Sequence, residues 1–285
     1  MAWDEVFGRI EPDGLPYSEA GSWAEEKHKL LAHYATLFVR SMRGKWGELV
    51  YLDLFSGAGA FRVRDTTRYY RSSPTIVYSL EDAFDSYVYC DADISNANAL
   101  QTRLGKVDLK RKFSVLSGDA NALTGRILAL VPQGNKDLRT LSFCFLDPFK
   151  IGNLKFETIR RLSERYMDFL VLIPSGMDAH RNVQTYTRAD IRTLDEFLGN
   201  SEWRLRWDHE SSKGTPFEQF VVTEFGRSMG TLGYIDPGLQ NVATIRSQEK
   251  NLLLYRLALY SRHKLGAKFW KETQKYTNPQ VGWDF

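Results

Sequence analysis

Apolar runs along the chain predict a series of buried strands that alternate with helices. Near-continuous apolar segments occupy 48–54, 86–90, 112–116, 141–146, 169–174 and 252–261. The intervening segments include expected helices at 22–42, 74–80, 94–104 and 122–130. Strands of this kind, separated by helices, are typical of a mainly parallel sheet covered on both faces. The pattern therefore predicts an α/β fold: a doubly wound, Rossmann-like sheet of about seven strands.

The length and composition favour one elaborated domain over residues 1–285. With 43% hydrophobic residues, the chain can bury a core of that size. We expect a helical extension, 1–47, before the first strand. A second departure from strand–helix alternation follows the fifth strand, where residues from about 182 to 245 read as a helical insertion with several aromatic residues available for packing.

A loop of small residues follows the first strand, which ends at Asp53. It contains Phe55, Ser56, Gly57 and Gly59, and its glycines would let a ligand approach the backbone closely. A dinucleotide fingerprint requires a third glycine three residues after Gly59, where this chain has an arginine, which disfavours a nicotinamide-dependent oxidoreductase. An aspartate ahead of such a loop suits a cofactor that carries an ammonium and no pyrophosphate. S-adenosylmethionine fits this description.

Acidic residues also end the next two strands, at Asp91 and Asp119. Asp53 would accept a hydrogen bond from the cofactor's ammonium, and Asp91 would accept both ribose hydroxyls. Asp119 would accept the amine of adenine, while the backbone amide of Ala120 donates to the ring. Each aspartate could instead cap the following helix or begin a turn. Three of them in register on successive strands favour the cofactor site.

The fourth strand ends at Asp147, Pro148 and Phe149, where a doubly wound sheet faces its substrate. In base-amine methyltransferases, a polar residue, prolines and an aromatic at this place hold a planar amine against the methyl donor. We therefore take these three as candidate catalytic residues, with Asp147 orienting the amine and Phe149 supporting the base. A second proline is absent here, and Pro148 alone could simply end the strand.

Basic residues on either side of the glycine loop are candidates for substrate contact. Lys27 and His28 precede the first strand on a helix that could fold over the site, although a solvated helix face would explain them equally. Arg62, Arg64 and Arg68 lie in a segment rich in arginine and tyrosine that reads as an exposed excursion. These side chains could contact phosphate while the tyrosines stack on bases, or the segment could be a solvated loop.

Several of these motifs together resemble the three-Cys-motif partner (TcmP) family, a group of class I S-adenosylmethionine-dependent methyltransferase-like proteins. The resemblance rests on the segments 26–31, 51–59, 73–74, 145–149, 260–266 and 268–270. It implies a radical-S-adenosylmethionine-like partner protein that carries three cysteines. The pair Lys27 and His28 ahead of the glycine loop also resembles adenine-N6 methyltransferases that act on ribosomal RNA.

Charge and cysteine content narrow the function further. A net charge of +3 is mildly basic, so an RNA or DNA partner stays open. Two cysteines, Cys90 and Cys144, can build neither a disulfide framework nor a zinc site, and we expect no metal. The polar start of the chain and the lack of a ~20-residue apolar run predict a cytoplasmic protein without a membrane segment. We expect a methyltransferase acting on a nucleic-acid base or related amine, or alternatively a catalytically silent recognition subunit for a partner enzyme.

Overall fold

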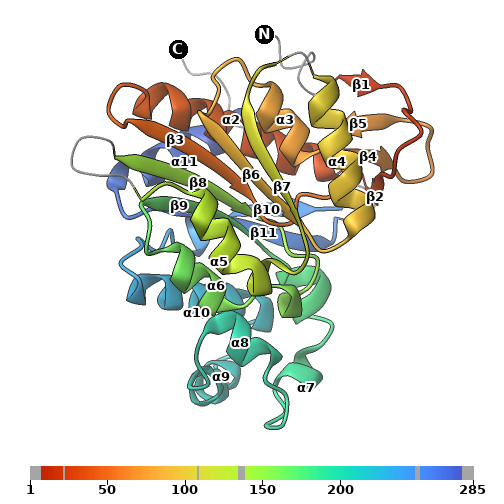
Figure 1. Ribbon diagram of the computed structural model, residues 1–285. Helices are drawn as coiled ribbons and strands as arrows, with labels where there is room; N and C mark the ends of the chain where they lie inside the picture. Colours follow the sequence, from red (N-terminus) through yellow and green to blue (C-terminus); the bar gives the residue numbers. More distant parts are fainter. Residues whose placement is uncertain (1–7, 22, 108, 134–138, 248–250, 278–285) are drawn as a thin grey trace, which may run out of the picture.

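A twisted seven-stranded sheet forms the centre of the molecule (Figure 1). The computed structural model describes residues 8–21, 23–107, 109–133, 139–247 and 251–277. The strand order is β10-β11-β9-β8-β3-β6-β7, and all neighbours are parallel except β11, which is antiparallel to both β9 and β10. The strands are β3 (Glu48–Asp53), β6 (Ser86–Asp91), β7 (Lys112–Ser117), β8 (Thr140–Leu146), β9 (Met167–Ile173), β10 (Ala243–Arg246) and β11 (Leu253–Tyr260). The expected mainly parallel, seven-stranded α/β sheet is confirmed.

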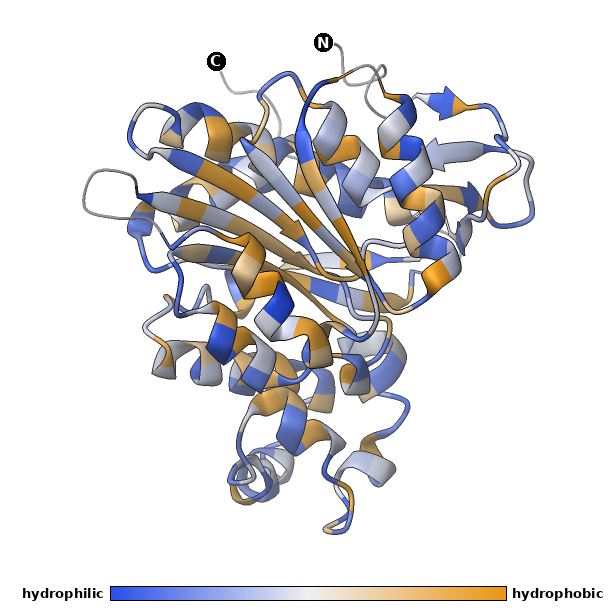
Figure 2. Ribbon diagram, in the orientation of Figure 1, coloured by the Kyte–Doolittle hydropathy of each residue, from blue (hydrophilic) through white to orange (hydrophobic). Residues whose placement is uncertain are grey.

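Helices cover both faces of the sheet, as Figure 1 shows. One face carries α2 (Trp23–Met42), α3 (Ser73–Ser79), α4 (Ile94–Lys106) and α11 (Lys264–Thr277). The other carries α5 (Ala120–Leu130), α6 (Phe156–Leu162), α8 (Thr193–Leu198) and α10 (Phe217–Thr231). The apolar strands lie between these two layers, which explains their near-continuous hydrophobicity (Figure 2). No helix among the described residues is both long and apolar enough to span a membrane.

Local sequence signals set several helix starts. Asp93 caps α4 by accepting a hydrogen bond from the amide of Ser95 at 2.7 Å, and Asp119 caps α5 by accepting one from the amide of Asn121 at 3.0 Å. Pro74 lies in the first turn of α3, where its missing N–H costs no helical hydrogen bond. The helices α4 and α5 therefore begin close to the carboxyl ends of β6 and β7.

A second, smaller sheet stands beside the first, at the right of Figure 1. It consists of β1 (Arg9–Ile10), β2 (Ser18–Ala20), β4 (Ala60–Val63) and β5 (Tyr69–Arg71), in the order β1-β5-β4-β2. The prediction of an exposed excursion after Phe61 is therefore partly wrong, because β4 and β5 form an antiparallel hairpin. Phe61 and Tyr70 stack at 5.8 Å between ring centroids, and Phe61 is buried together with Ala24, which holds the hairpin against α2. The segment before β3 also contains two short strands as well as its helix.

The segment between β9 and β10 is mainly helical. It contains α7 (Val183–Tyr186), α8, α9 (Trp203–Ser212) and α10, followed by the 3-10 turn Leu239–Asn241. Trp207 packs against Phe217 and Phe220 at 4.8 and 5.1 Å between ring centroids, so the aromatic residues of this segment stabilise its own packing. Residues 243–245, expected within the insertion, instead belong to the edge strand β10.

The chain reverses its direction across the sheet between β3 and β8. From β3 it moves outward through β6 to β7 and then returns to β8 on the other side of β3. Open α/β sheets bind ligands at such a switch point, outside the carboxyl ends of the strands. Asp53 ends β3 and is in register with Phe145 of β8, two residues before Asp147. Two of the predicted site residues therefore lie at the switch point.

Candidate functional site

Asp53 lies beneath the glycine loop and is completely buried. Its carboxylate accepts a hydrogen bond from the amide of Phe55 at 3.4 Å and one from the hydroxyl of Tyr51, also at 3.4 Å. Burial is the main reason that the pKa of Asp53 is raised to about 7, although a hydrogen bond from Ser73 opposes this rise. With no exposed surface, Asp53 supports the loop from below, and direct contact with a ligand would require the loop to shift.

Gly57 joins the loop to the second strand. Its amide donates a 2.7 Å hydrogen bond to Asp91, whose carboxylate also accepts from the amide of Asp93 at 3.0 Å and from the side chain of Asn96 at 3.1 Å. The backbone of Gly57 has a φ of +61°, and a Cβ added there would meet no atom within 4 Å. The loop therefore has open space directly above it, as a ligand-binding loop requires.

Gly59 has a different role from Gly57 in the same loop. It too has a positive φ, of +85°, but a Cβ added at Gly59 would lie 2.9 Å from side-chain atoms of both Thr75 and Leu100. The hydroxyl of Thr75 also donates a 2.6 Å hydrogen bond to the carbonyl of Gly59. The glycine is needed for close packing of the loop against α3 and α4, and Ser56 anchors the loop further through hydrogen bonds to the carbonyl of Cys90.

Asp119 and Ala120 lie at the start of α5, at the same edge of the sheet. Asp119 is exposed, and one of its carboxylate oxygens accepts hydrogen bonds from both the amide and the side chain of Asn121. Ala120 is buried in the first turn of the helix. Asp119 is therefore a helix cap, the alternative that its sequence position left open, and its second oxygen remains available to a ligand.

Asp147 follows β8 and forms an ion pair with Lys27 of α2, with 2.5 Å between Nζ and Oδ2. The two side chains are 18% and 8% exposed, so the pair is largely shielded from water. Pro148 is buried, whereas Phe149 is 69% exposed. The end of β8 thus carries a partly accessible carboxylate and, two residues later, an exposed aromatic ring.

Lys27 and His28 do not lie on a solvated helix face, the alternative considered for them. They are only 7% and 4% exposed, and the His28 ring lies 5.3 Å from that of Phe61 in the small sheet. Burial, reinforced by the charge of Lys27, holds the pKa of His28 well below its usual value, so that its imidazole is neutral. His28 therefore connects α2 to the small sheet, and Lys27 reaches the switch point.

Two aromatic residues at the site were missed by the sequence analysis. Trp23 packs against Tyr255 of β11 at 5.1 Å between ring centroids, and Lys27 Nζ lies 5.8 Å from the centre of the Trp23 ring. Burial raises the pKa of Tyr255, the charge of Asp147 raises it further and that of Arg64 lowers it. Tyr255 therefore responds to the charges of both Asp147 and Arg64. It stands within a long apolar strand, so its sequence position indicates only a core residue.

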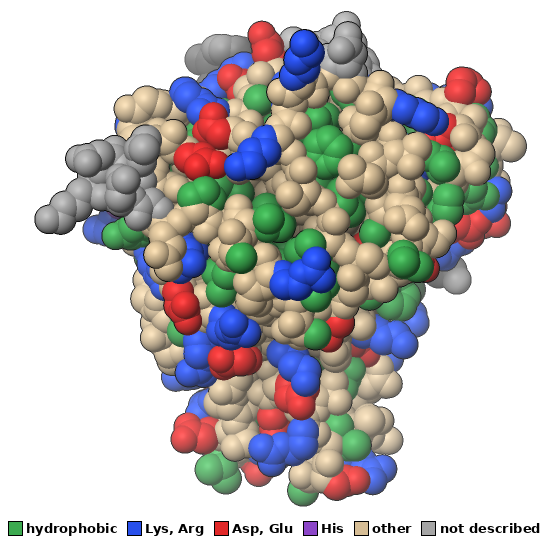
Figure 3. All heavy atoms as spheres, viewed as in Figure 1, with side chains coloured by type: hydrophobic (Ala, Val, Ile, Leu, Met, Phe, Trp, Pro, Cys, Tyr) green, Lys and Arg blue, Asp and Glu red, His purple; other side chains and the backbone are tan. Residues whose placement is uncertain are grey.

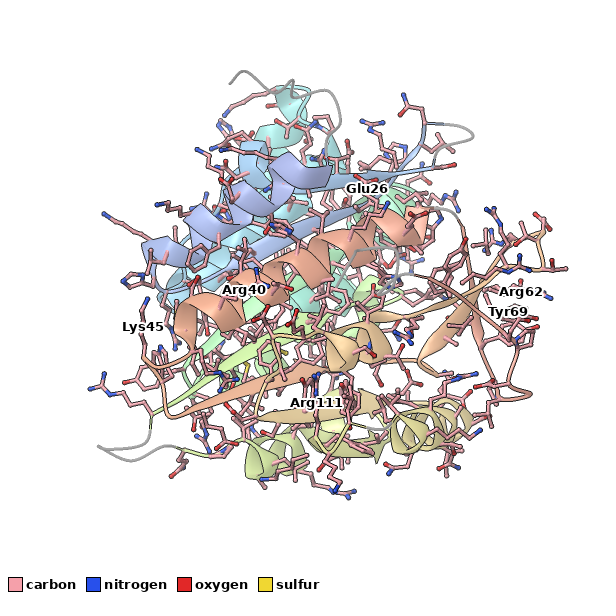
Figure 4. All side chains as sticks on the ribbon, turned by 90° about the horizontal axis from the view of Figure 1, so that it is seen from above. Glu26, Arg40, Lys45, Arg62, Tyr69 and Arg111 are labelled. Atoms are coloured by element: carbon pink, nitrogen blue, oxygen red, sulfur yellow. The ribbon has the colours of Figure 1, made fainter. Side chains whose placement is uncertain are left out.

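The three candidate arginines differ in their surroundings. Arg62 forms an ion pair with Glu19, and its guanidinium lies 5.2 Å from the centre of the Tyr17 ring. Figure 4 shows Arg62 and Tyr69 together on the small sheet. Arg64 and Arg68 are exposed, and within the described part of the chain neither forms an ion pair. Arg64 and Arg68 therefore lie exposed in the turn between β4 and β5, whereas the charge of Arg62 is already neutralised by Glu19.

Metal coordination has no support among the residues that the structure describes. No group of three or more histidine, cysteine, aspartate or glutamate side chains in those residues is close enough together to hold a metal ion. Both cysteines are buried thiols, and burial raises the pKa of Cys90 to about 12.

Comparison with known proteins finds similarity only to solved structures. No family model matches the chain, and no curated protein sequence matches it. Similar structures include a Legionella pneumophila protein (13% identity, TM-score 0.45, covering 89% of this chain and 93% of that chain). A second is Trm1 from Pyrococcus horikoshii with S-adenosyl-L-methionine, which is 14% identical with a TM-score of 0.44 and covers 93% of this chain and 63% of that chain. A third is TYW2 from M. jannaschii in complex with AdoMet, which is 7% identical with a TM-score of 0.42 and covers 90% of this chain and 87% of that chain. The resemblance to the three-Cys-motif partner family stays a prediction.

Proposed function

We propose that this protein transfers a methyl group from S-adenosylmethionine to an amine of a nucleic-acid base. The observation that carries the proposal is the hydrogen bond from the Gly57 amide to Asp91, at the same edge of the sheet as the ion pair of Asp147 and Lys27. A glycine loop with open space beside Gly57, the half-buried Asp91 and the Asp147–Lys27 pair along one edge of the sheet support the proposal. This edge is the switch point where α/β sheets bind ligands.

The residues around the glycine loop fit this cofactor. Asp91 is held in place by three donors, and its carboxylate lies beside the loop where ribose hydroxyls would bind. The exposed oxygen of Asp119 and the amide of Ala120 would contact the adenine ring. Asp53 would act from beneath, through the loop that it supports. When bound, S-adenosylmethionine supplies an electrophilic methyl group; the protein contributes position and charge.

Asp147 and Phe149 would hold the acceptor. Lys27 occupies Oδ2 of Asp147, and Oδ1 is the oxygen that would accept a hydrogen bond from the acceptor amine. This hydrogen bond would orient the acceptor amine, whose nitrogen would become positive during the transfer. The Asp147 carboxylate would stabilise that charge and accept the proton that leaves. Phe149, exposed at the mouth, would stack on the base.

The small sheet would bind the rest of the nucleic acid. Lysine, arginine and acidic side chains are interspersed over the face shown in Figure 3, consistent with the small net charge. Arg64, whose charge acts on Tyr255, and the exposed Arg68 would provide a local basic surface for phosphate. A three-cysteine, radical-S-adenosylmethionine-like protein would be a second partner, which rests on the family resemblance alone.

Two measurements test the proposal. The first is calorimetric titration of the protein with S-adenosylmethionine. We expect saturable binding that Asp91→Ala weakens more than tenfold, whereas Asp93→Ala, which removes a neighbouring helix cap, changes it less than threefold. The second is transfer of labelled methyl groups to RNA and DNA. We expect Asp147→Asn to retain cofactor binding and to lose methyl transfer. If the wild type fails to bind the cofactor, the recognition-subunit alternative is favoured instead.

A further inference from the structure

A cavity lies at the opposite edge of the sheet from the proposed catalytic site. Its volume is about 430 Å³, which falls within the usual range for small-molecule sites. Leu141 and Met167 lie at the starts of β8 and β9, whereas Asp147 follows the end of β8. The cavity is therefore separated from Asp147 by the length of a strand. Along α2, Met42 at the cavity is fifteen residues from Lys27, or about 22 Å at 1.5 Å per residue.

Helix α2 shows the separation of the two sites directly. In Figure 4 the label of Glu26, beside Lys27, lies at one end of this helix, and that of Lys45, which lines the cavity, lies beyond the other. Arg62 and the small sheet are on the Glu26 side. Nothing that binds in the cavity would therefore touch the residues assigned to methyl transfer.

The walls of the cavity are mainly apolar and aromatic. They are formed by Phe38, Trp46, Tyr166 and Phe269, together with methionine and leucine side chains. Trp46 and Tyr166 pack at 5.4 Å between ring centroids with an angle of 58°, and Tyr166 is 59% exposed. An exposed tyrosine beside a partly buried tryptophan forms an open aromatic rim, which is favourable for binding an apolar or cationic group.

Asp168 supplies a carboxylate to this otherwise apolar cavity. It accepts a hydrogen bond from the Tyr34 hydroxyl at 3.3 Å and another from Ser261. Burial raises the pKa of Asp168 to about 6, which still leaves it mainly ionised at pH 7.5. In the described part of the chain, no lysine, arginine or histidine forms an ion pair with it. An anion in such surroundings lacks the positive partner that would offset the cost of its burial.

The nearby basic side chains do not fill this role. The guanidinium of Arg262 donates to the carbonyls of Leu232 and Arg165 and stacks on Tyr234, 4.5 Å from its ring centre. Lys45 and His263 are exposed at the rim. The charge of Arg262 lowers the pKa of Asp168, but this effect is smaller than those of burial and of the hydrogen bonds from Ser261 and Tyr34. The carboxylate is therefore without a direct cationic partner.

The segment after β11 builds this arrangement. A Cβ added at Gly266 would lie 2.4 Å from Cβ of Ser261 and 3.5 Å from Oδ2 of Asp168, so a glycine is required for α11 to pack here. The Ser261 hydroxyl accepts a hydrogen bond from the amide of His263 at 3.1 Å. Ser261 and Gly266 belong to the segment 260–266 that the sequence analysis singled out, and neither takes part in the proposed methyl transfer.

We infer that this cavity is a second binding site, which takes a small organic cation with an amine joined to an aromatic or other apolar body. The amine would donate to Asp168, while the apolar body packs against Phe38, Trp46 and Tyr166. The inference does not depend on the proposed methyltransferase activity, since it uses none of the same residues.

Calorimetric titration with 2-phenylethylamine and its neutral isostere 2-phenylethanol tests the inference at pH 7.5. We expect the wild type to bind the amine at least tenfold more tightly than the alcohol. Asp168→Asn keeps an oxygen to accept the Tyr34 hydroxyl and should abolish this preference. Tyr166→Ala should weaken binding of both compounds. Asp147→Asn, at the other edge, should change neither.

The outcomes that overturn the inference are equally specific. They are equal binding of the amine and the alcohol, no binding of either, or a preference for the amine that persists in Asp168→Asn. If Asp168→Asn fails to fold, binding of the amine is measured with Met42→Trp instead, because the larger side chain fills the cavity from the end of α2. Amine binding unchanged in a folded Met42→Trp protein would assign the binding to another place on the molecule.

Discussion

Lys27 and Asp147, which are 120 residues apart in the sequence, form an ion pair with 2.5 Å between Nζ and Oδ2. The pair connects the first turns of α2 to the end of β8 and is shielded by Trp23 and Tyr255. The ion pair occupies Oδ2 of Asp147 and leaves Oδ1 for the amine of the proposed substrate. It also makes Lys27 a positioning residue, because it acts on the substrate through Asp147.

Replacing Lys27 tests this role. We expect Lys27→Met to lower the rate of methyl transfer at least tenfold and to leave S-adenosylmethionine binding within threefold of the wild type. The free energy of unfolding of the variant should also be about 2 kcal/mol lower than that of the wild type, since Asp147 loses its hydrogen-bonded partner. Lys29→Met is the matched control: it removes the exposed ion pair with Glu25 on the same helix and should cost less than about 0.5 kcal/mol. Equal losses in the two variants would contradict the assignment.

The buried carboxyl of Asp53 predicts a pH dependence of stability. Its pKa is about 7 in the folded protein against 3.8 in the unfolded chain, so the folded state binds a proton more tightly between these values. The free energy of unfolding therefore falls as the pH rises from about 4 to about 7, by about 1.4 kcal/mol for each unit of pKa difference. Well below pH 3.8 both states are protonated, and the free energy of unfolding no longer depends on the titration of this group.

Urea denaturation of the wild type and Asp53→Asn at several pH values checks this prediction. Asparagine resembles the protonated carboxyl and does not titrate, so the stability of the variant relative to the wild type should increase by a few kcal/mol between pH 4 and pH 8. Asp168→Asn should show the same sign over a shorter window, up to about pH 6. Parallel stability curves for wild type and Asp53→Asn would show that the carboxyl titrates normally.

The two loop glycines should respond differently to alanine. At Gly59 the new Cβ would meet Thr75 and Leu100 at 2.9 Å in addition to the strain of a positive φ, so we expect a loss of about 2–4 kcal/mol. At Gly57 the Cβ enters open space, and only the backbone strain of about 1–2 kcal/mol applies. Thermal unfolding measures both. However, Gly57→Ala should weaken cofactor binding, because it fills the space above the loop; unchanged binding would contradict the proposed position of the ligand.

Arginines of the small sheet should contribute unequally to nucleic-acid binding. Arg64→Ala and Arg68→Ala should each weaken binding of a single-stranded RNA oligonucleotide several-fold at low salt and reduce the dependence of affinity on salt concentration. Arg62→Ala should have a smaller effect, since Glu19 already neutralises that side chain. Fluorescence anisotropy at three salt concentrations measures the difference. Equal effects of all three substitutions would show that Arg62 leaves Glu19 when RNA binds.

Most of the main sheet could be predicted because its strands are buried on both faces and read as continuous apolar runs. β3 and β8 illustrate this, with every residue of β8 buried. β4, β5 and β10 were not predicted. β4 mixes Phe61 and Val63 with arginine, and β10 is a four-residue edge strand. These strands are short, and β4 and β5 pair with each other while β10 pairs with β11. Their own residue patterns are too brief to indicate this pairing, which depends on the surrounding fold.

Site residues could be predicted where strand ends alone bring them together. Asp53, Asp91 and Asp147 follow this rule because parallel strands end at one edge. Other relationships depend on packing between distant segments. Neither the contact between Trp23 and Tyr255 nor the burial of Lys27 has a local signal, since α2 could have been placed with this face toward water. The position of Asp168 at the opposite edge depends likewise on how α11 packs.

Helix α2 packs against α11, near the other end of the chain, and this contact affects the order in which the protein can fold during synthesis. Tyr34 lies 6.1 Å from Trp270 between ring centroids, and both are almost completely buried. A ribosome that has released only the first two hundred residues has exposed Tyr34 without the ring that covers it. The face of the sheet beneath α2 is completed only after β11 and α11 emerge, so part of the apolar surface of α2 stays exposed while the segment between Tyr34 and Trp270 is synthesised.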